Sequence, residues 1–111
     1  MIMKIPLFKP YLNNNEKNII SRTLDIGFLG MGKNTLVFEN LIKKELKLKN
    51  HFVLCCNTGF SALHLALISL NLKKNDEVII PSFSNVANIQ TILNLDLKPV
   101  FCDIDDETFC I

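Results

Sequence analysis

Residues 55–70, "CCNTGFSALHLALISL", decide how this chain is expected to fold. A continuous apolar run, residues 52–56, ends at Asn57-Thr58-Gly59, and an almost wholly apolar segment follows at once. A short apolar run bounded by polar residues is typical of a strand that is buried on both faces. Residues 60–70 have the length and composition of a buried helix. We therefore predict a strand that passes through a tight turn into a helix.

The same alternation continues toward the end of the chain. Residues 77–80 and 99–102 are two more short apolar runs, and between them Ser84 is placed to cap a helix over residues 85–95. Strands that alternate with helices of about ten residues favour parallel pairing through right-handed crossovers. Residues 51–111 are therefore expected to form a βαβαβ unit with parallel strands.

The first part of the chain shows helical patterns instead. Asn13 followed by Glu16 is typical of a capped helix start, and Gly27 is placed to end that helix. From about residue 35 the apolar residues recur on one face with the period of a helix. We predict a helical lead-in over residues 1–50, and we interpret the whole chain, residues 1–111, as one α/β segment.

Composition and charge exclude several classes of function. Apolar residues make up 49% of the 111 residues and charged residues 21%, as in a globular protein. The net charge is only +1, so nothing favours nucleic acid as a partner. No apolar run approaches the ~18 residues of a membrane span, and the start lacks the pattern of a signal peptide. We expect a cytoplasmic protein without a membrane partner.

Three further features are interpreted as structural. The four cysteines form no C-x-x-C pair, which disfavours a zinc or redox site. Asp103, Asp105 and Asp106 follow the last predicted strand; we expect no metal site there, and acid–base work or metal binding by these carboxylates is the alternative. His64 lies between two leucines and is interpreted as a half-buried packing residue with one hydrogen bond.

The turn at residues 57–61 is the best candidate for a binding site. Ligands bind outside the carboxyl ends of parallel strands, and a helix N-terminus offers unpaired N–H groups and a partial positive charge. Gly59 lets an anion approach the backbone closely, and Thr58 and Ser61 add hydroxyl groups. The alternative is that these residues only turn the chain and cap the helix. No G-x-G-x-x-G or P-loop pattern is present, so the sequence offers no dinucleotide or Walker-type site.

Motifs along almost the whole chain resemble one family. They are the "NTG" turn before "ALHLAL", then "DEVIIPSF", then "KPVFCDID", with "GFLGMG" nearer the start. In this order they are similar to the DegT/DnrJ/EryC1/StrS family of aminotransferases, which use pyridoxal 5′-phosphate and act on keto-sugars linked to a nucleotide. The resemblance implies the N-terminal part of the large domain of a fold type I enzyme.

The resemblance also implies roles for individual residues. The turn formed by Thr58, Gly59, Phe60 and Ser61 matches the one that holds the cofactor phosphate, although the family usually has threonine where this chain has Phe60. Asn85 stands where the family has an aromatic residue that stacks on the pyridine ring, and it offers only its amide plane.

Gly27, Phe28 and Leu29 belong to a loop that lies near the substrate in the resembling enzymes. A plain connection between two helices is the alternative interpretation of this loop.

Two hypotheses about function follow. In the first, the chain is the N-terminal portion of an aminotransferase that uses an amino donor and a nucleotide-linked keto-deoxy sugar, for surface polysaccharide or related sugar biosynthesis, and that is a homodimer at full length. The resemblance places the Schiff-base lysine and its aspartate partner beyond Ile111, so we expect no catalytic residue here and an inactive chain. In the second, the chain is a non-catalytic α/β module that binds a phosphorylated ligand or a partner chain.

Overall fold

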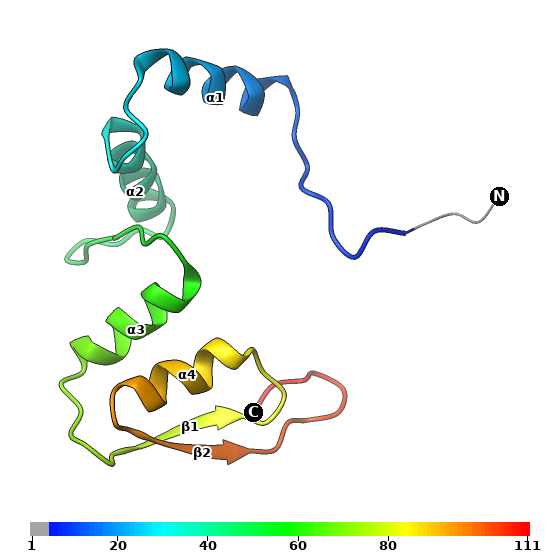
Figure 1. The fold of residues 1–111 in the computed structure, drawn as a ribbon, viewed down its shortest axis with the longest axis vertical. Helices are drawn as coiled ribbons and strands as arrows, with labels where there is room; N and C mark the ends of the chain where they lie inside the picture. The colour runs from blue at the N-terminus through cyan, green and yellow to red at the C-terminus, as the bar shows by residue number, and fades with distance from the viewer. Residues whose placement is uncertain (1–4) are drawn as a thin grey trace. The chain divides into compact units, whose positions relative to one another are not determined.

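A computed structural model describes residues 5–111 of the chain (Figure 1). The chain divides into two compact units, Met1–Val53 and Leu54–Ile111. The first unit contains helices α1 (Asn14–Ile26) and α2 (Lys33–Glu45). The second contains helix α3 (Gly59–Ser69), strand β1 (Glu77–Pro81), helix α4 (Val86–Asn94) and strand β2 (Lys98–Cys102).

Helix α1 begins and ends where the sequence signals place it. The Asn15 backbone N–H donates to the Asn13 side chain at 2.7 Å, and the Asn13 backbone N–H donates to the Glu16 carboxylate at 2.7 Å. These two bonds form a reciprocal capping box. At the other end Gly27 has φ of 75°, and its N–H donates to the Leu24 carbonyl at 2.9 Å. Both predicted ends of this helix are confirmed.

Helix α2 starts two residues earlier than predicted, at Lys33 instead of 35. Its N-cap is Gly32, which has no side chain to bond the first amides. Lys43 and Lys44 lie in the last turn, where positive charge is favourable against the helix dipole. The Lys43 ammonium also lies 5.5 Å from the centroid of the Phe52 ring.

The second unit is built on two parallel strands. Strands β1 and β2 pair from Glu77 opposite Lys98 to Pro81 opposite Cys102, and α4 connects them. Helix α4 packs against both strands and against α3. Its Ile92 lies with Ile80 and Leu97 in the small apolar core. The parallel pairing and the α/β class are as predicted.

The strand expected at residues 52–56 does not form in the structure. A strand exists only when a neighbouring backbone pairs with it. Strands β1 and β2 pair with each other, and no other strand occurs in residues 5–111. Phe52 is accordingly 95% exposed. The observed order is therefore ααα followed by βαβ, with one strand fewer than predicted.

Much apolar surface remains open to solvent. Of the described residues, only Thr91 and the three apolar residues of the core are buried. On the sheet, Ile79 is 63% exposed and Phe101 is 57% exposed. Helix α3 is apolar almost throughout, yet among the described helices and strands its main contacts are with α4, and Leu67 packs against the core. Apolar surface of this extent is typical of an interface with further protein.

Within the described part of the chain, no helix has the length and apolar character needed to cross a bilayer.

Candidate functional site

The first turn of α3 is organised by Thr58. Thr58 is the N-cap in an extended conformation, and its hydroxyl accepts a hydrogen bond from the Ser61 N–H at 3.1 Å. The two hydroxyls of Thr58 and Ser61 lie 3.0 Å apart and share a second hydrogen bond. The Ala62 N–H donates to the Thr58 carbonyl at 3.1 Å. The sequence suggested these hydroxyls as ligand donors, and the structure shows that they also bond to each other.

Two amides of this turn are left over. The N–H groups of Gly59 and Phe60 lie in the first turn of the helix, where no helix carbonyl is placed to accept from them. Among the hydrogen bonds of residues 5–111 that the structure shows, none uses these two amides. They are the donors that remain for a ligand at this end of the helix.

Gly59 lies beside open space. A Cβ atom added to it would meet no atom within 4 Å, and its φ is outside the left-handed region. Neither packing nor backbone strain within the chain therefore requires glycine at this position. The open space leaves room for a ligand to approach the backbone closely.

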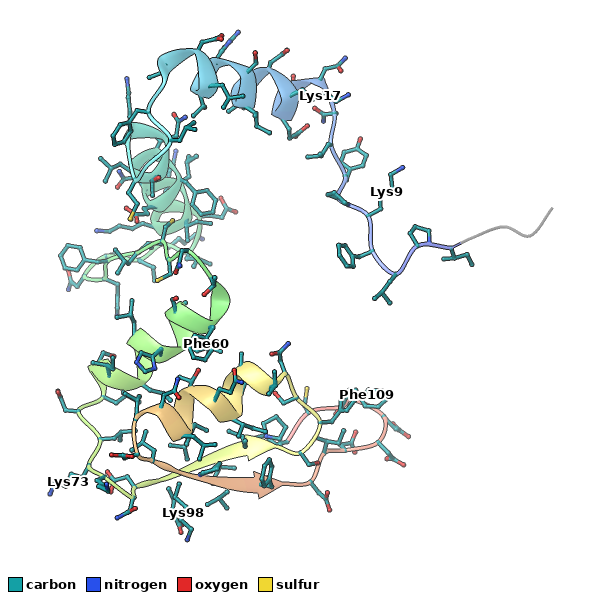
Figure 2. The ribbon with its side chains drawn as sticks, viewed as in Figure 1. Lys9, Lys17, Phe60, Lys73, Lys98 and Phe109 are labelled. Atoms are coloured by element: carbon teal, nitrogen blue, oxygen red, sulfur yellow. The ribbon has the colours of Figure 1, made fainter. Side chains whose placement is uncertain are left out.

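Phe60 contributes its backbone alone to this turn. Its ring stacks on the His64 ring, with centroids 6.1 Å apart and planes inclined by 11° (Figure 2 labels Phe60). His64 is half-buried as expected, but its Nδ1 atom is buried and has no hydrogen-bond partner among the described residues. The single hydrogen bond predicted for His64 is therefore not seen at this atom.

Helix α4 begins at the same edge as α3. Figure 1 shows both helices starting at the side where β1 and β2 end. The N-cap of α4 is Asn85, whose side-chain oxygen accepts from the Ala87 N–H at 2.9 Å. Ser84, the cap that the sequence suggested, bonds instead to the Asn88 side chain. The cap is one residue later than predicted because the asparagine oxygen reaches the amide two residues on.

The two segments that lead into α3 and α4 carry no charged side chain. Residues 57–61 and 82–88 contain neither acidic nor basic residues. An anion at either helix start is therefore attracted by backbone N–H groups, hydroxyls and the partial charge of about +0.5 at each helix N-terminus. Acidic residues 103, 105, 106 and 107 follow the end of β2.

The charged pairs of this unit lie where the strands begin. The Lys74 ammonium is 3.2 Å from Asp96, and the Lys98 ammonium is 2.7 Å from Glu77. Figure 2 shows Lys73 and Lys98 at the side opposite the start of α3. Lys73, Lys74 and Lys98 are exposed.

The glycine loop of the first unit borders a cavity of about 380 Å³. Phe28 and Leu29 line it, whereas Gly27 does not and instead ends α1. A Cβ atom on Gly32 would lie 2.8 Å from the Phe28 ring, so that ring rests directly on the glycine backbone. Two of the three residues predicted to bind substrate therefore line a hollow, and the third has a conformational role.

The hydrogen bonds and ring contact in the loop that follows β2 were not predicted from the sequence. The rings of Phe83 and Phe109 lie 5.9 Å apart, tilted by 47°. The Asp105 carboxylate accepts hydrogen bonds from the Thr108 N–H and hydroxyl, at 2.8 and 2.9 Å. These bonds hold the pKa of Asp105 below its ordinary value. An aspartate followed three residues later by threonine is the local signal for such a turn.

Comparison with known proteins decides the family. The model of the DegT/DnrJ/EryC1/StrS aminotransferase family matches residues 10–111. The chain belongs to this family. The fold implied by the resemblance and the family cofactor, pyridoxal phosphate, are thereby confirmed: solved relatives carry this cofactor or its amino form.

Individual relatives show how much of the protein is matched. GDP-perosamine synthase of Vibrio cholerae is 35% identical over 94% of this chain, which covers 28% of that enzyme. dTDP-4-dehydro-2,3,6-trideoxy-D-glucose 4-aminotransferase of Saccharopolyspora spinosa is 34% identical over 94% of the chain and 27% of its own length. The structure of E. coli GDP-4-keto-6-deoxy-D-mannose-3-dehydratase with bound hydrated pyridoxal phosphate superposes with a TM-score of 0.87, at 25% identity, over 98% of the chain and 29% of its own. The chain thus spans somewhat more than a quarter of the length of these relatives.

Proposed function

We propose that this chain forms the phosphate-binding part of a pyridoxal-phosphate enzyme that transfers an amino group to a nucleotide-linked keto-deoxy sugar. The observation that carries the proposal is the N-terminus of α3, where the amides of Gly59 and Phe60 face no acceptor and Gly59 adjoins open space. Family membership gives this turn a ligand, because relatives of the same fold hold a phosphorylated cofactor.

The donors of the turn fit a phosphate group. The amides of Gly59 and Phe60 supply two N–H groups. Because the Thr58 and Ser61 hydroxyls share one hydrogen between them, one hydroxyl hydrogen is left for the ligand. Three donors at a helix N-terminus are a sufficient set for the oxygens of one phosphate. A bound cofactor supplies the chemistry of amino transfer through its aldehyde group.

We propose that residues 1–111 do not catalyse amino transfer by themselves. The reaction needs a lysine amine at the reacting carbon. The lysines nearest in sequence to the turn's helix, Lys73 and Lys74, lie at its far end, and Lys74 is paired with Asp96. The nucleotide sugar, the amino donor, the homodimer, the role in surface polysaccharide synthesis and the cytoplasmic location remain predictions for the enzyme of which this fold is part. Phe28 and Leu29 are proposed to contact the substrate.

A chimera tests the proposed function. Residues 1–111 replace the matched segment of the Vibrio cholerae GDP-perosamine synthase, and amino transfer to its keto-sugar substrate is measured. We expect activity in the chimera and little activity when Gly59→Asp places a carboxylate at the phosphate turn. A chimera that folds and assembles like the parent enzyme but transfers no amino group contradicts the proposal. Because one relative is a dehydratase, sugar products are analysed for deoxygenation as well as amination.

The expected inactivity of the chain alone has its own test. The purified chain is mixed with pyridoxal phosphate, reduced with borohydride and digested, and the modified lysines are mapped. We expect scattered, low modification of exposed lysines. Stoichiometric labelling of one lysine contradicts the claim that the reactive amine is absent from this part of the fold.

The second candidate is a non-catalytic module that pairs with another polypeptide. The exposed apolar surface of α3 and of the sheet favours it. An inactive chimera, together with a stable complex between the isolated chain and another polypeptide, is the outcome that distinguishes this candidate from the first.

A further inference from the structure

His64 is the titratable side chain of α3, and the proposed function does not use it. Its Nδ1 atom is buried and has no hydrogen-bond partner among the described residues, so no hydrogen bond fixes this side of the ring. Histidine is the side chain that ordinarily changes charge between about pH 5 and pH 8. A buried histidine nitrogen without a partner is therefore a place where the uptake of a proton changes the local interactions.

The His64 ring is connected to the phosphate turn through Phe60. The two rings are nearly parallel, with centroids 6.1 Å apart and planes inclined by 11°. Phe60 is the second residue of α3, and its backbone N–H is one of the two amides that make no hydrogen bond within residues 5–111. The ring that supports Phe60 thus lies one turn behind an amide that is proposed to hold the phosphate.

The surroundings of His64 offer no negative charge to a protonated ring. Apart from His64, neither α3 nor α4, which packs against it, contains a titratable side chain. Protonation makes both ring nitrogens donors, and at Nδ1 no partner lies among the described residues. The Phe60 ring stacks on the flat side of the imidazole, so it cannot accept a hydrogen bond that leaves in the plane of the ring. A charged ring with a buried, unpaired donor is expected to leave its place against Phe60.

We propose that His64 is a pH-sensitive support of the phosphate turn: its neutral ring stacks on Phe60 and holds the first turn of α3 in the conformation that binds an anion, and its protonation loosens that turn. This inference rests on the proposed function of the turn and adds regulation by pH to it. The direction of the effect is diagnostic. Loosening of the turn predicts weaker anion binding at low pH, whereas simple attraction between a charged His64 and the anion predicts stronger binding.

Sulfate is the probe for this coupling. It is titrated into the isotope-labelled chain between about pH 5.5 and pH 7.5, where histidine changes charge and sulfate, unlike phosphate, does not. The His64 ring signals report protonation, the Gly59 and Phe60 amide signals report binding, and the secondary shifts of residues 60–62 report the helical turn. We expect sulfate affinity to fall by about 5-fold as His64 is protonated, the lower end of the roughly 5- to 150-fold that one unpaired buried donor costs. The secondary shifts should decrease with the same midpoint, with or without sulfate.

The chain has two histidines, and the second provides a matched control. His64→Phe keeps an aromatic ring for the stack and removes the titrating group, so sulfate binding should no longer depend on pH. His51 is exposed, and His51→Gln should leave the fall in affinity as it is in the wild-type chain. Phe60→Leu removes the ring contact and should reduce the pH dependence although His64 still titrates.

The outcomes separate this inference from the proposed function. If sulfate shifts the Gly59 and Phe60 amides with an affinity that stays constant or rises as His64 is protonated, the pH-sensitive support is wrong and the phosphate turn stands. The support is also wrong if His64→Phe keeps the wild-type pH dependence, or if the secondary shifts of residues 60–62 do not follow His64. If sulfate shifts neither amide while those secondary shifts do follow His64, the phosphate site fails and the coupling between His64 and the turn stands.

Discussion

Truncation of Ile92 should remove most of the stability of the second unit. Ile92 is 2% exposed and shares the core with only Ile80 and Leu97. Burial of each such side chain stabilises the fold by about 1.5–3 kcal/mol, so the three together contribute roughly 5–9 kcal/mol. Ile92→Ala costs about 2–5 kcal/mol, because the contacts are lost and a cavity is left. A loss of that size is a large part of the stabilisation that the three core side chains provide to the second unit.

Ile79 provides the matched control. It is the same residue type in the neighbouring strand β1, but it is 63% exposed. Ile79→Ala should cost less than about 1 kcal/mol, mainly through the weaker strand preference of alanine. Urea unfolding of both variants at low protein concentration, followed by circular dichroism, measures the two free energies. Equal losses at the two sites would refute the assignment of core and surface, and would mean that protein covers Ile79 in solution.

Three smaller perturbations test local features. Gly27→Ala should fray the end of α1 at a cost of about 1 kcal/mol, because φ of 75° is strained for a residue with a Cβ; NMR secondary shifts of α1 report it, and unchanged shifts contradict it. Thr58→Ala should lower the stability of α3 by about 1 kcal/mol through loss of the bond to Ser61, whereas Thr58→Ser should not, as measured by amide hydrogen exchange; equal exchange in both variants argues against the cap. Because the pKa of Asp105 is lowered in the folded chain, the turn formed by Asp105 and Thr108 should be stable above the ordinary aspartate pKa and should open as pH falls through the lower folded pKa. The pH titration of the Thr108 amide signal measures this opening, and Thr108→Val should move its midpoint to higher pH.

The elements defined by local signals were predictable from the sequence. Asn13 with Glu16, and Gly27, fixed both ends of α1, since capping depends on residues within one turn of each other. Strands β1 and β2 were found as short apolar runs, within one residue of their observed limits. Helix α3 was found for the same reason, as an apolar segment directly after a capping threonine.

The features that depend on distant or competing partners were not predictable. Residues 52–56 have the composition of a strand, but pairing requires a second backbone that these residues do not meet within 5–111. Asn85 caps α4 in place of Ser84, whose hydroxyl bonds to the Asn88 side chain. The phosphate turn was predicted from its residue types. The hydrogen bond between the Thr58 and Ser61 hydroxyls, which leaves one hydroxyl hydrogen instead of two for a ligand, depends on how the side chains are oriented and could not be predicted.

The proposed phosphate site depends most directly on Gly59. The isotope-labelled chain and its Gly59→Ala variant are titrated with inorganic phosphate, and the amide signals are followed by NMR. Because a Cβ at Gly59 meets no atom within 4 Å, the variant should fold with equal stability, or greater by about 0.4–1 kcal/mol. We expect phosphate to move the Gly59 and Phe60 signals in the wild-type chain and to bind much more weakly to the variant. Equal binding by both chains, or shifts confined to the opposite edge near Lys74 and Lys98, would contradict a phosphate site at the start of α3.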